Sequence, residues 1–280
     1  MLELDQELQD KLNNLELWFK QKQGSIVAFS GGIDSTLVLF LARKFQGKDC
    51  AIGVISNSES LKQKDFSLAK DFCQQFDIKL EVIKTNELED ERYNENPINR
   101  CFFCKEHLFT DLTVISRKYP GFLVLSGTNY DDLGDYRPGI EAAKKLNVKS
   151  PLVDCKITKN ELRKIARCYE LPNWNKPASP CLSSRIPYGH KVTRAKLYQV
   201  EAAENILNEY GFKDVRVRHF DTYGKIEVLK KDLANLSLVQ HEVIEKITTL
   251  GFQTLEVDTE GLVSGKMNRA IGRIKTQPLP

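Results

Sequence analysis

The spacing of apolar residues predicts alternating helices and strands in the first two-thirds of the chain. Apolar residues recur at helical intervals over residues 2–22, which predicts an amphipathic helix that ends at Gly24. Four short apolar runs have the length of strands: 25–29, 51–55, 79–83 and 122–125. Helical patterns separate the first three runs, and this alternation is typical of βαβ units. We therefore predict an α/β domain with a doubly wound parallel sheet.

The pattern changes towards the C-terminus. Residues 158–170 predict a helix that begins with a capping box of Thr158 and Glu161. Residues 171–189 are rich in proline and serine and predict a loop. A second series of elements follows: helices at 193–210 and 231–250, and strands at 213–220, 224–229 and 252–257. We expect two domains, residues 1–189 and residues 190–280, the second a small α+β domain resembling a ferredoxin-like half-sandwich.

Composition narrows the class of protein. The chain has 280 residues, with 41 Lys and Arg against 38 Asp and Glu, so its net charge is +3. This balance does not favour bulk nucleic-acid binding, which usually needs a strong basic excess. The longest apolar run, residues 37–42, is far shorter than the roughly 18 residues of a membrane span. Acidic residues near the N-terminus interrupt any export signal, so we expect a cytoplasmic protein with reduced thiols.

The sharpest local motif is Ser-Gly-Gly-Ile-Asp-Ser-Thr at residues 30–36, between a predicted strand and a predicted helix. Two glycines allow a tight turn, and the N–H groups at a helix N-terminus bind phosphate oxygens. Asp34 is placed to hold Mg²⁺ or to fix the loop. The motif is neither a Walker A loop nor a dinucleotide fingerprint, and the alternative is a plain glycine-rich turn. The anion-binding candidates are Ser30, Gly31, Gly32, Asp34, Ser35 and Thr36.

Three of the seven cysteines form a candidate metal or sulfur site. Cys101 and Cys104 are a C-x-x-C pair, and Cys181 lies in the predicted loop. Three thiolates are one short of the usual set for a [4Fe-4S] cluster and leave one iron open. Structural zinc would need a fourth ligand, such as His107, and a redox pair or buried thiols are further alternatives. The other cysteines are expected in the core: Cys50, Cys73, Cys155 and Cys168.

The loop motif resembles the PP-loop of ATP pyrophosphatases, which cleave ATP between the α and β phosphates and adenylate a substrate oxygen. The resemblance covers about residues 25–170. It implies a parallel five-stranded sheet with ATP at the carboxyl ends of the strands. Ser56 would then border the adenine, and Gly127, within Ser-Gly-Thr-Asn at residues 126–129, would approach the nucleotide.

Further motifs resemble the LarE family, which helps to make the nickel-pincer nucleotide of lactate racemase. They are GTNYDD at 127–132, DYRPG at 135–139, SPL at 150–152, KPASPCLSSRIPYG at 176–189, VRVR at 215–218 and KIE at 225–227. This resemblance implies adenylation of the carboxylates of pyridinium-3,5-biscarboxylic acid mononucleotide, followed by conversion to thiocarboxylates. Single-cysteine members sacrifice one cysteine as the sulfur donor, and Cys181 matches that position. Three-cysteine PP-loop sulfurtransferases instead carry a [4Fe-4S] cluster, and this sequence is similar to them in having Cys101 and Cys104.

Charged residues near Cys181 and in the second domain are substrate candidates. Arg185 could orient a carboxylate or phosphate or lower the pKa of the Cys181 thiol, or it is an ordinary loop arginine. Arg216 and Arg218 are two apart on a predicted strand, so both face one side. Paired guanidinium groups suit phosphates and carboxylates, although solvated edge arginines are the alternative. The resemblance associates two acidic residues with metal or substrate handling: Glu204 and Glu227.

These observations predict an ATP-dependent sulfurtransferase that forms AMP and pyrophosphate, with Cys181, Asp34 and Arg185 as catalytic candidates. The expected cofactors are ATP, Mg²⁺ and a [4Fe-4S] cluster, the substrate is a small nucleotide, and the source of sulfide is open. The resemblance also implies a homo-oligomer, often a hexamer. The alternatives are a sacrificial LarE protein without a cluster, a tRNA-thiolating enzyme, a PP-loop amidating enzyme and an ATP-binding regulatory module. Salt-sensitive tRNA binding would favour the thiolase.

Overall fold

The chain forms two compact units. The computed structural model describes residues 4–134, 137–263, 265, 266 and 269. Unit 1 comprises Met1–Glu87 and Cys101–Ser179, and unit 2 comprises Leu88–Arg100 and Pro180–Pro280. The division therefore lies at residue 179, not at the expected residue 189.

Hydrogen bonds within unit 2 give the physical reason for this division. Asn96 is fully buried, and its side-chain amide donates to the carbonyl oxygens of Ile186 (3.1 Å), Pro187 (2.6 Å) and His190 (3.1 Å). The backbone N–H of Gly189 in turn donates to the carbonyl of Asn96. Much of the loop that carries Cys181 is thus hydrogen-bonded to a segment 90 residues earlier. No pattern in the sequence predicts these long-range hydrogen bonds.

Unit 1 contains a parallel sheet with strand order β3-β2-β1-β4. Its strands are β1 (Gly24–Ala28), β2 (Ala51–Ser56), β3 (Lys79–Ile83) and β4 (Phe122–Leu125). All residues of β1 and all but the last of β2 are buried, as both faces of a central parallel strand should be. The four predicted strands are confirmed.

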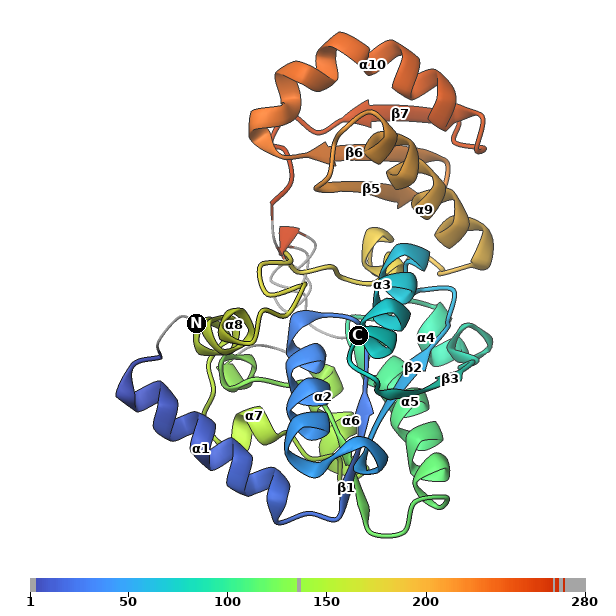
Figure 1. Cartoon of the computed structure of the whole chain (residues 1–280). Helices are drawn as coiled ribbons and strands as arrows, with labels where there is room; N and C mark the ends of the chain where they lie inside the picture. The colour runs from blue at the N-terminus through green and yellow to red at the C-terminus, as the bar shows by residue number, and fades with distance from the viewer. Residues whose placement is uncertain (1–3, 135–136, 264, 267–268, 270–280) are drawn as a thin grey trace. The chain divides into compact units, whose positions relative to one another are not determined.

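Helices cover both faces of this sheet (Figure 1). The helices that lie largely or wholly in unit 1 are α1 (Gln6–Lys20), α2 (Ile33–Gln46), α3 (Gln63–Gln75), α5 (Arg100–Ser116), α6 (Pro138–Lys145), α7 (Pro151–Asp154) and α8 (Lys159–Cys168). Val27 on β1 packs with α1, α2 and α8 in one apolar cluster, while Ile26 and Ala28 pack with α5 and α6 in another. Alternate side chains of one strand thus enter two cores, which confirms the doubly wound architecture.

The expected fifth strand of this sheet is not formed among the described residues. Lys149 makes a single parallel bridge to Leu125 next to β4. Pro151 begins α7 two residues later. Because proline has no N–H to donate and favours the first turn of a helix, the ladder stops after one bridge.

Unit 2 contains a separate three-stranded sheet with order β5-β6-β7. Its elements are α4 (Glu91–Asn94), α9 (Arg194–Glu209), β5 (Val215–Phe220), β6 (Tyr223–Val228), α10 (Leu233–Thr248) and β7 (Thr254–Val257). β5 and β6 form the predicted antiparallel hairpin, and β7 pairs parallel to β6. Val217 and Ile226 lie in an apolar cluster with residues of α9 and α10. The predicted α+β series is confirmed.

Short 3-10 helices connect several of these elements. They are η1 (Lys48–Cys50), η2 (Glu87–Glu89), η3 (Tyr130–Gly134), η4 (Leu182–Arg185) and η5 (Lys230–Asp232). Over the described residues, every helix is too short or too polar to cross a membrane.

Candidate functional site

The phosphate-loop motif lies between β1 and the first turn of α2, as predicted. Gly31 has φ of 68°, which favours glycine, and a Cβ at this position would also be crowded, 3.1 Å from the carbonyl oxygen of Asp65. The Ser35 hydroxyl donates to the carbonyl of Gly32 (3.1 Å) and accepts from the N–H of Ser30 (3.2 Å). The loop therefore folds back on the N-terminus of α2, the kind of helix end at which backbone N–H groups suit phosphate oxygens.

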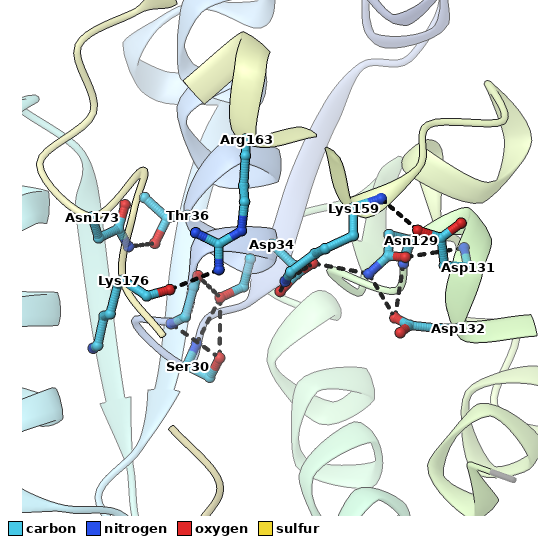
Figure 2. A network of polar contacts seen from close by, with 12 residues as sticks. Ser30, Asp34, Thr36, Asn129, Asp131, Asp132, Lys159, Arg163, Asn173 and Lys176 are labelled. Atoms are coloured by element: carbon cyan, nitrogen blue, oxygen red, sulfur yellow. Dashed lines mark hydrogen bonds and ion pairs between the residues drawn. The ribbon is translucent and has the colours of Figure 1, made fainter. Parts of the chain in front are cut away.

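Asp34, in the first turn of α2, is held by a lysine and an amide (Figure 2). Lys159 Nζ lies 2.7 and 2.5 Å from the two carboxylate oxygens, and Asn129 Nδ2 donates to Oδ1 at 2.9 Å. The side chains of Asp34 and Lys159 are 26% and 36% exposed, so a ligand can reach both. Lys159 was not a candidate in the sequence, although it directly follows the capping residue of α8.

Asn129 connects Asp34 to a second, buried carboxylate. Its side-chain amide also donates to Asp132 (3.0 Å), and its side-chain oxygen accepts from the N–H of Asp131 (3.1 Å). Burial raises the pKa of Asp132, and the neighbouring Asp34 adds to this effect, whereas the Asn129 N–H bond and the charges of Arg137 and Lys159 oppose it. Every polar atom of the Asn129 side chain is thus engaged, which fixes the amide that orients Asp34.

Gly127 lies where the chain beyond β4 comes closest to the loop. A Cβ on Gly127 would lie 2.6 Å from the backbone nitrogen of Ser35 and 2.9 Å from its Cα. Ser126, one residue earlier, shares hydroxyl hydrogen bonds with Thr128 and Ser150. The segment after β4 thus lies directly against the backbone of the first turn of α2, and its expected approach to the nucleotide stays a prediction.

We expect Gly127→Ala to lower the free energy of unfolding by about 2 kcal/mol, because the added methyl group must displace the first turn of α2. Gly134→Ala is the matched control, since a Cβ there would meet no heavy atom within 4 Å. Chemical denaturation of both variants measures the difference. Equal stabilities would show that Gly127 does not make this close approach.

A segment leading towards Cys181 is attached to the phosphate loop within unit 1. The Asn173 amide donates to the Thr36 hydroxyl (2.8 Å), and Lys176 Nζ lies 2.8 Å from an oxygen of Asp65. The Ser179 hydroxyl donates to the other oxygen of Asp65 (2.7 Å). Burial alone would raise the pKa of Asp65, but these bonds outweigh it and lower that pKa. Residues 173–179 thus form an anchored strap, a feature that proline and serine content did not predict.

Cys181 is exposed and precedes η4 in unit 2. Arg185, only 1% exposed, donates through Nη1 to the carbonyls of Pro180 (2.7 Å) and Cys181 (3.1 Å). Its Nε and Nη2 donate to the carboxylate of Glu204 at 2.8 and 3.2 Å. Glu204, itself 2% exposed, also accepts the N–H of Val217 on the sheet edge. Arg185 and Glu204 therefore hold the backbone at Cys181, which differs from the direct substrate contacts that the sequence suggested.

The two arginines of β5 have different surroundings. Arg218 is 3% exposed, pairs with Glu227 at 2.9 Å and donates to the Ser184 carbonyl at 2.8 Å. Lys266 lies 3.5 Å from the other oxygen of Glu227. Arg216 is half-buried, and burial followed by repulsion from Arg218 and Arg185 lowers its pKa. Within the described residues no hydrogen bond or ion pair engages the Arg216 side chain, and its expected contact with an anionic substrate stays a prediction.

The candidate metal ligands lie in different units. Cys101 and Cys104 are one turn apart near the start of α5 and belong to unit 1, whereas Cys181 belongs to unit 2. The part of the chain that the structure describes contains no group of three or more His, Cys, Asp and Glu side chains placed to hold a metal ion. The [4Fe-4S] cluster expected from the three cysteines therefore stays a prediction.

The other cysteines are less uniform than predicted. Cys73 is buried, and burial raises its pKa to about 12. Cys155 is half-buried, and burial, with the charge of Asp154, raises its pKa to about 11. Cys50 and Cys168 are also only half-buried. The core position is confirmed for Cys73 alone.

The chain is similar in sequence to one protein-family model and to several known proteins. Residues 5–99 match the model of the NAD synthase family. The chain is 39% identical over 268 residues to an uncharacterised protein of Synechocystis sp., covering 94% of this chain and 99% of that protein. It is 33% identical over 249 residues to the pyridinium-3,5-bisthiocarboxylic acid mononucleotide synthase of Lactiplantibacillus plantarum, covering 89% and 90%. An uncharacterised protein of Methanocaldococcus jannaschii is 31% identical over 248 residues, covering 89% and 94%.

Proposed function

Because this chain belongs to the LarE family of PP-loop proteins, we propose that it converts carboxylates of pyridinium-3,5-biscarboxylic acid mononucleotide into thiocarboxylates at the expense of ATP. Membership of this family itself indicates an ATP-using enzyme of the PP-loop type. One observation supports the proposed thiocarboxylate synthesis. This chain, with its phosphate loop and exposed Cys181, aligns over about nine-tenths of its length with a protein named as a bisthiocarboxylic acid mononucleotide synthase.

The first step is adenylation. A substrate carboxylate oxygen attacks the α-phosphorus of ATP, the bond to the β-phosphate oxygen breaks, and pyrophosphate leaves. The loop N–H groups and the N-terminus of α2 hold the phosphates, and they stabilise charge that grows on the departing pyrophosphate. Asp34 supplies the carboxylate oxygens that Mg²⁺ prefers, and Mg²⁺ bound with the nucleotide would add further charge neutralisation.

Lys159 supplies the cation that the loop sequence lacks. The loop itself contains no lysine, unlike a Walker A loop. Lys159 Nζ forms an ion pair with Asp34, and the lysine side chain is partly exposed. The backbone N–H of Lys159 donates to the Asp131 carboxylate at 2.8 Å. When Asp34 binds the metal ion of an incoming nucleotide, the Lys159 ammonium group is released from Asp34. It can then contact the phosphates of the nucleotide.

We expect Lys159→Ala to lower kcat/KM for AMP formation by about a hundredfold, because a positive charge at the leaving pyrophosphate is lost. Lys159→Arg should restore most of the loss. Lys144→Ala on α6 is the control, since this lysine is exposed and far from the loop in sequence. The role proposed for Lys159 would be refuted by an alanine variant as active as the control.

The second step transfers sulfur. The Cys181 thiolate attacks the acyl adenylate carbon, the carbon–oxygen bond to AMP breaks, and a thioester forms. An adenylate is a good leaving group, so a soft thiolate suffices. In the sacrificial route, loss of the Cys181 Cα proton and cleavage of its carbon–sulfur bond release the thiocarboxylate and leave dehydroalanine.

The experiment that tests this function incubates the purified full chain with ATP, Mg²⁺ and the biscarboxylic acid mononucleotide. We expect AMP, pyrophosphate and a product whose mass shows oxygen replaced by sulfur. Product formed without ATP, or AMP formed with ammonia but no sulfur transfer, would contradict the proposal. The [4Fe-4S] cluster stays a prediction from the three cysteines, and iron and sulfide analysis of anaerobically purified protein tests it separately.

A further inference from the structure

The strap, residues 173–179, contacts the phosphate loop at one carbonyl group. The side-chain amide of Asn173 donates to the Gly31 carbonyl oxygen at 3.3 Å. The same amide donates to the Thr36 hydroxyl at 2.8 Å (Figure 2), and Thr36 is fully buried, so Asn173 has a fixed point on α2. Lys176 Nζ also donates to the Gly31 oxygen, at 3.4 Å. Two donors that lie 142 and 145 residues later in the chain thus meet one carbonyl of the loop.

Lys176 is itself held at both ends. Its ammonium group pairs with the buried Asp65 at 2.8 Å. Its backbone carbonyl accepts from Arg163 Nη2 at 2.8 Å (Figure 2). Because an ammonium group has three N–H donors, Lys176 can serve the carboxylate of Asp65 and the carbonyl of Gly31 together. The donor that meets the loop is therefore kept in place by α3 and by α8.

The held carbonyl determines where the next N–H points. In a planar trans peptide, the C=O and the N–H of the following residue point in opposite directions. The Gly31 carbonyl faces the strap, so the Gly32 N–H faces away from it. This N–H lies on the side of Ser30, whose Oγ is 3.4 Å from the Gly32 nitrogen.

The observed conformation does not explain why residue 32 is glycine. Gly32 has φ of −77° and ψ of 153°, which any residue adopts. Among the described residues, a Cβ at this position would meet only Ser30 Oγ, at an ordinary contact distance of 3.4 Å. Rotation of the Gly31–Gly32 peptide by half a turn would bring φ of Gly32 to positive values, which favour glycine. The two glycines thus leave this peptide free to rotate, and the hydrogen bonds from the strap oppose the rotation.

We propose that Asn173 and Lys176 are positioning residues that lock the Gly31–Gly32 peptide with its N–H towards the phosphates of the nucleotide. The inference rests on the proposed use of ATP and goes beyond it, because it assigns control of phosphate affinity to the strap. The rotated peptide presents a carbonyl oxygen instead of an N–H, and that oxygen repels an anion. A loop that spends about a tenth of its time in the competent orientation binds about tenfold more weakly, because affinity falls with the populated fraction.

The test is a double-mutant cycle on Lys176 and Gly32, in which calorimetry on the full chain gives Kd for ATP with Mg²⁺. We expect Lys176→Met to raise Kd by about tenfold. Lys176→Arg should return Kd to within about threefold of the wild type, because a guanidinium group can pair with Asp65 and donate to the carbonyl. In the Gly32→Ala background, Lys176→Met should raise Kd by no more than about twofold, because alanine disfavours the rotated peptide even without the strap.

Lys11→Met is the matched control. Lys11 pairs with Glu161 at 2.6 Å in unit 1, and the exposed fractions of the Lys11 and Lys176 side chains, 23% and 20%, are similar. Its Kd should equal that of the wild type, and an increase as large as that of Lys176→Met would overturn the lock. So would an unchanged Kd in Lys176→Met, an equal increase in both backgrounds, or loss of all binding in Gly32→Ala, each of which leaves the use of ATP intact. A wild type that does not bind ATP would overturn the proposed function and the inference together.

Discussion

Cys181→Ala is expected to abolish thiocarboxylate formation, by at least about a thousandfold, while substrate-dependent release of pyrophosphate continues. The reason is that the two proposed steps use residues of different units. The phosphate loop, Asp34 and Lys159 belong to unit 1, whereas Cys181 is exposed in unit 2 and makes no part of the loop. Removing the thiol therefore removes the nucleophile of the second step and leaves adenylation intact.

Quantifying pyrophosphate and thiocarboxylate in one reaction mixture measures both steps. Cys50→Ala is the matched control, because Cys50 is a half-buried thiol of unit 1 with no role in the proposed chemistry. Normal thiocarboxylate formation by Cys181→Ala would contradict both the sacrificial and the cluster-dependent route of sulfur transfer. Simultaneous loss of pyrophosphate release would show instead that the two steps are not separable in this way.

Glu204→Gln is expected to destabilise unit 2 by about 3 kcal/mol and to change the reactivity of Cys181. A buried arginine whose carboxylate partner is removed keeps an uncompensated charge, which is one of the costliest single changes in a folded protein. Arg185 would lose the negative charge and one of the two oxygens that accept from its Nε and Nη2, and its Nη1 holds the carbonyls of Pro180 and Cys181. The backbone that presents the thiol should therefore become less ordered.

Two measurements separate positioning from stability. Denaturation of the full chain gives the loss of stability, and the rate at which iodoacetamide modifies Cys181 under folding conditions reports its presentation. Glu209→Gln is the control on the same helix, because Glu209 is exposed near the end of α9. If Glu204→Gln matched this control in both measurements, the buried pair would not position Cys181.

Prediction from the sequence was most accurate for structural features that depend on residues close together in the chain. The strand, loop and helix around Ser30 to Thr36 were predicted correctly, because hydrophobic run length, glycine content and the helix start are local signals. The small C-terminal sheet followed from the same kind of pattern. The expected fifth strand failed because its single bridge at Lys149 is stopped by Pro151, a short-range signal that was available but not used.

Contacts between distant residues could not be predicted in this way. Lys159 is 125 residues from Asp34, and only the fold brings them together. Arg185 was a candidate because it lies near Cys181, but its burial with Glu204 depends on the packing of α9 against β5. Pairing of this kind leaves no periodic trace in a single sequence.

The central claim is that a substrate carboxylate is adenylated before sulfur is transferred. The most direct measurement supplies the mononucleotide with heavy oxygen in its carboxylates and follows that label by mass spectrometry. The account predicts one labelled oxygen in the phosphate of each AMP, because the carboxylate oxygen that attacked the α-phosphorus departs with AMP. Unlabelled AMP alongside the thiocarboxylate product, or label in pyrophosphate, would contradict the account.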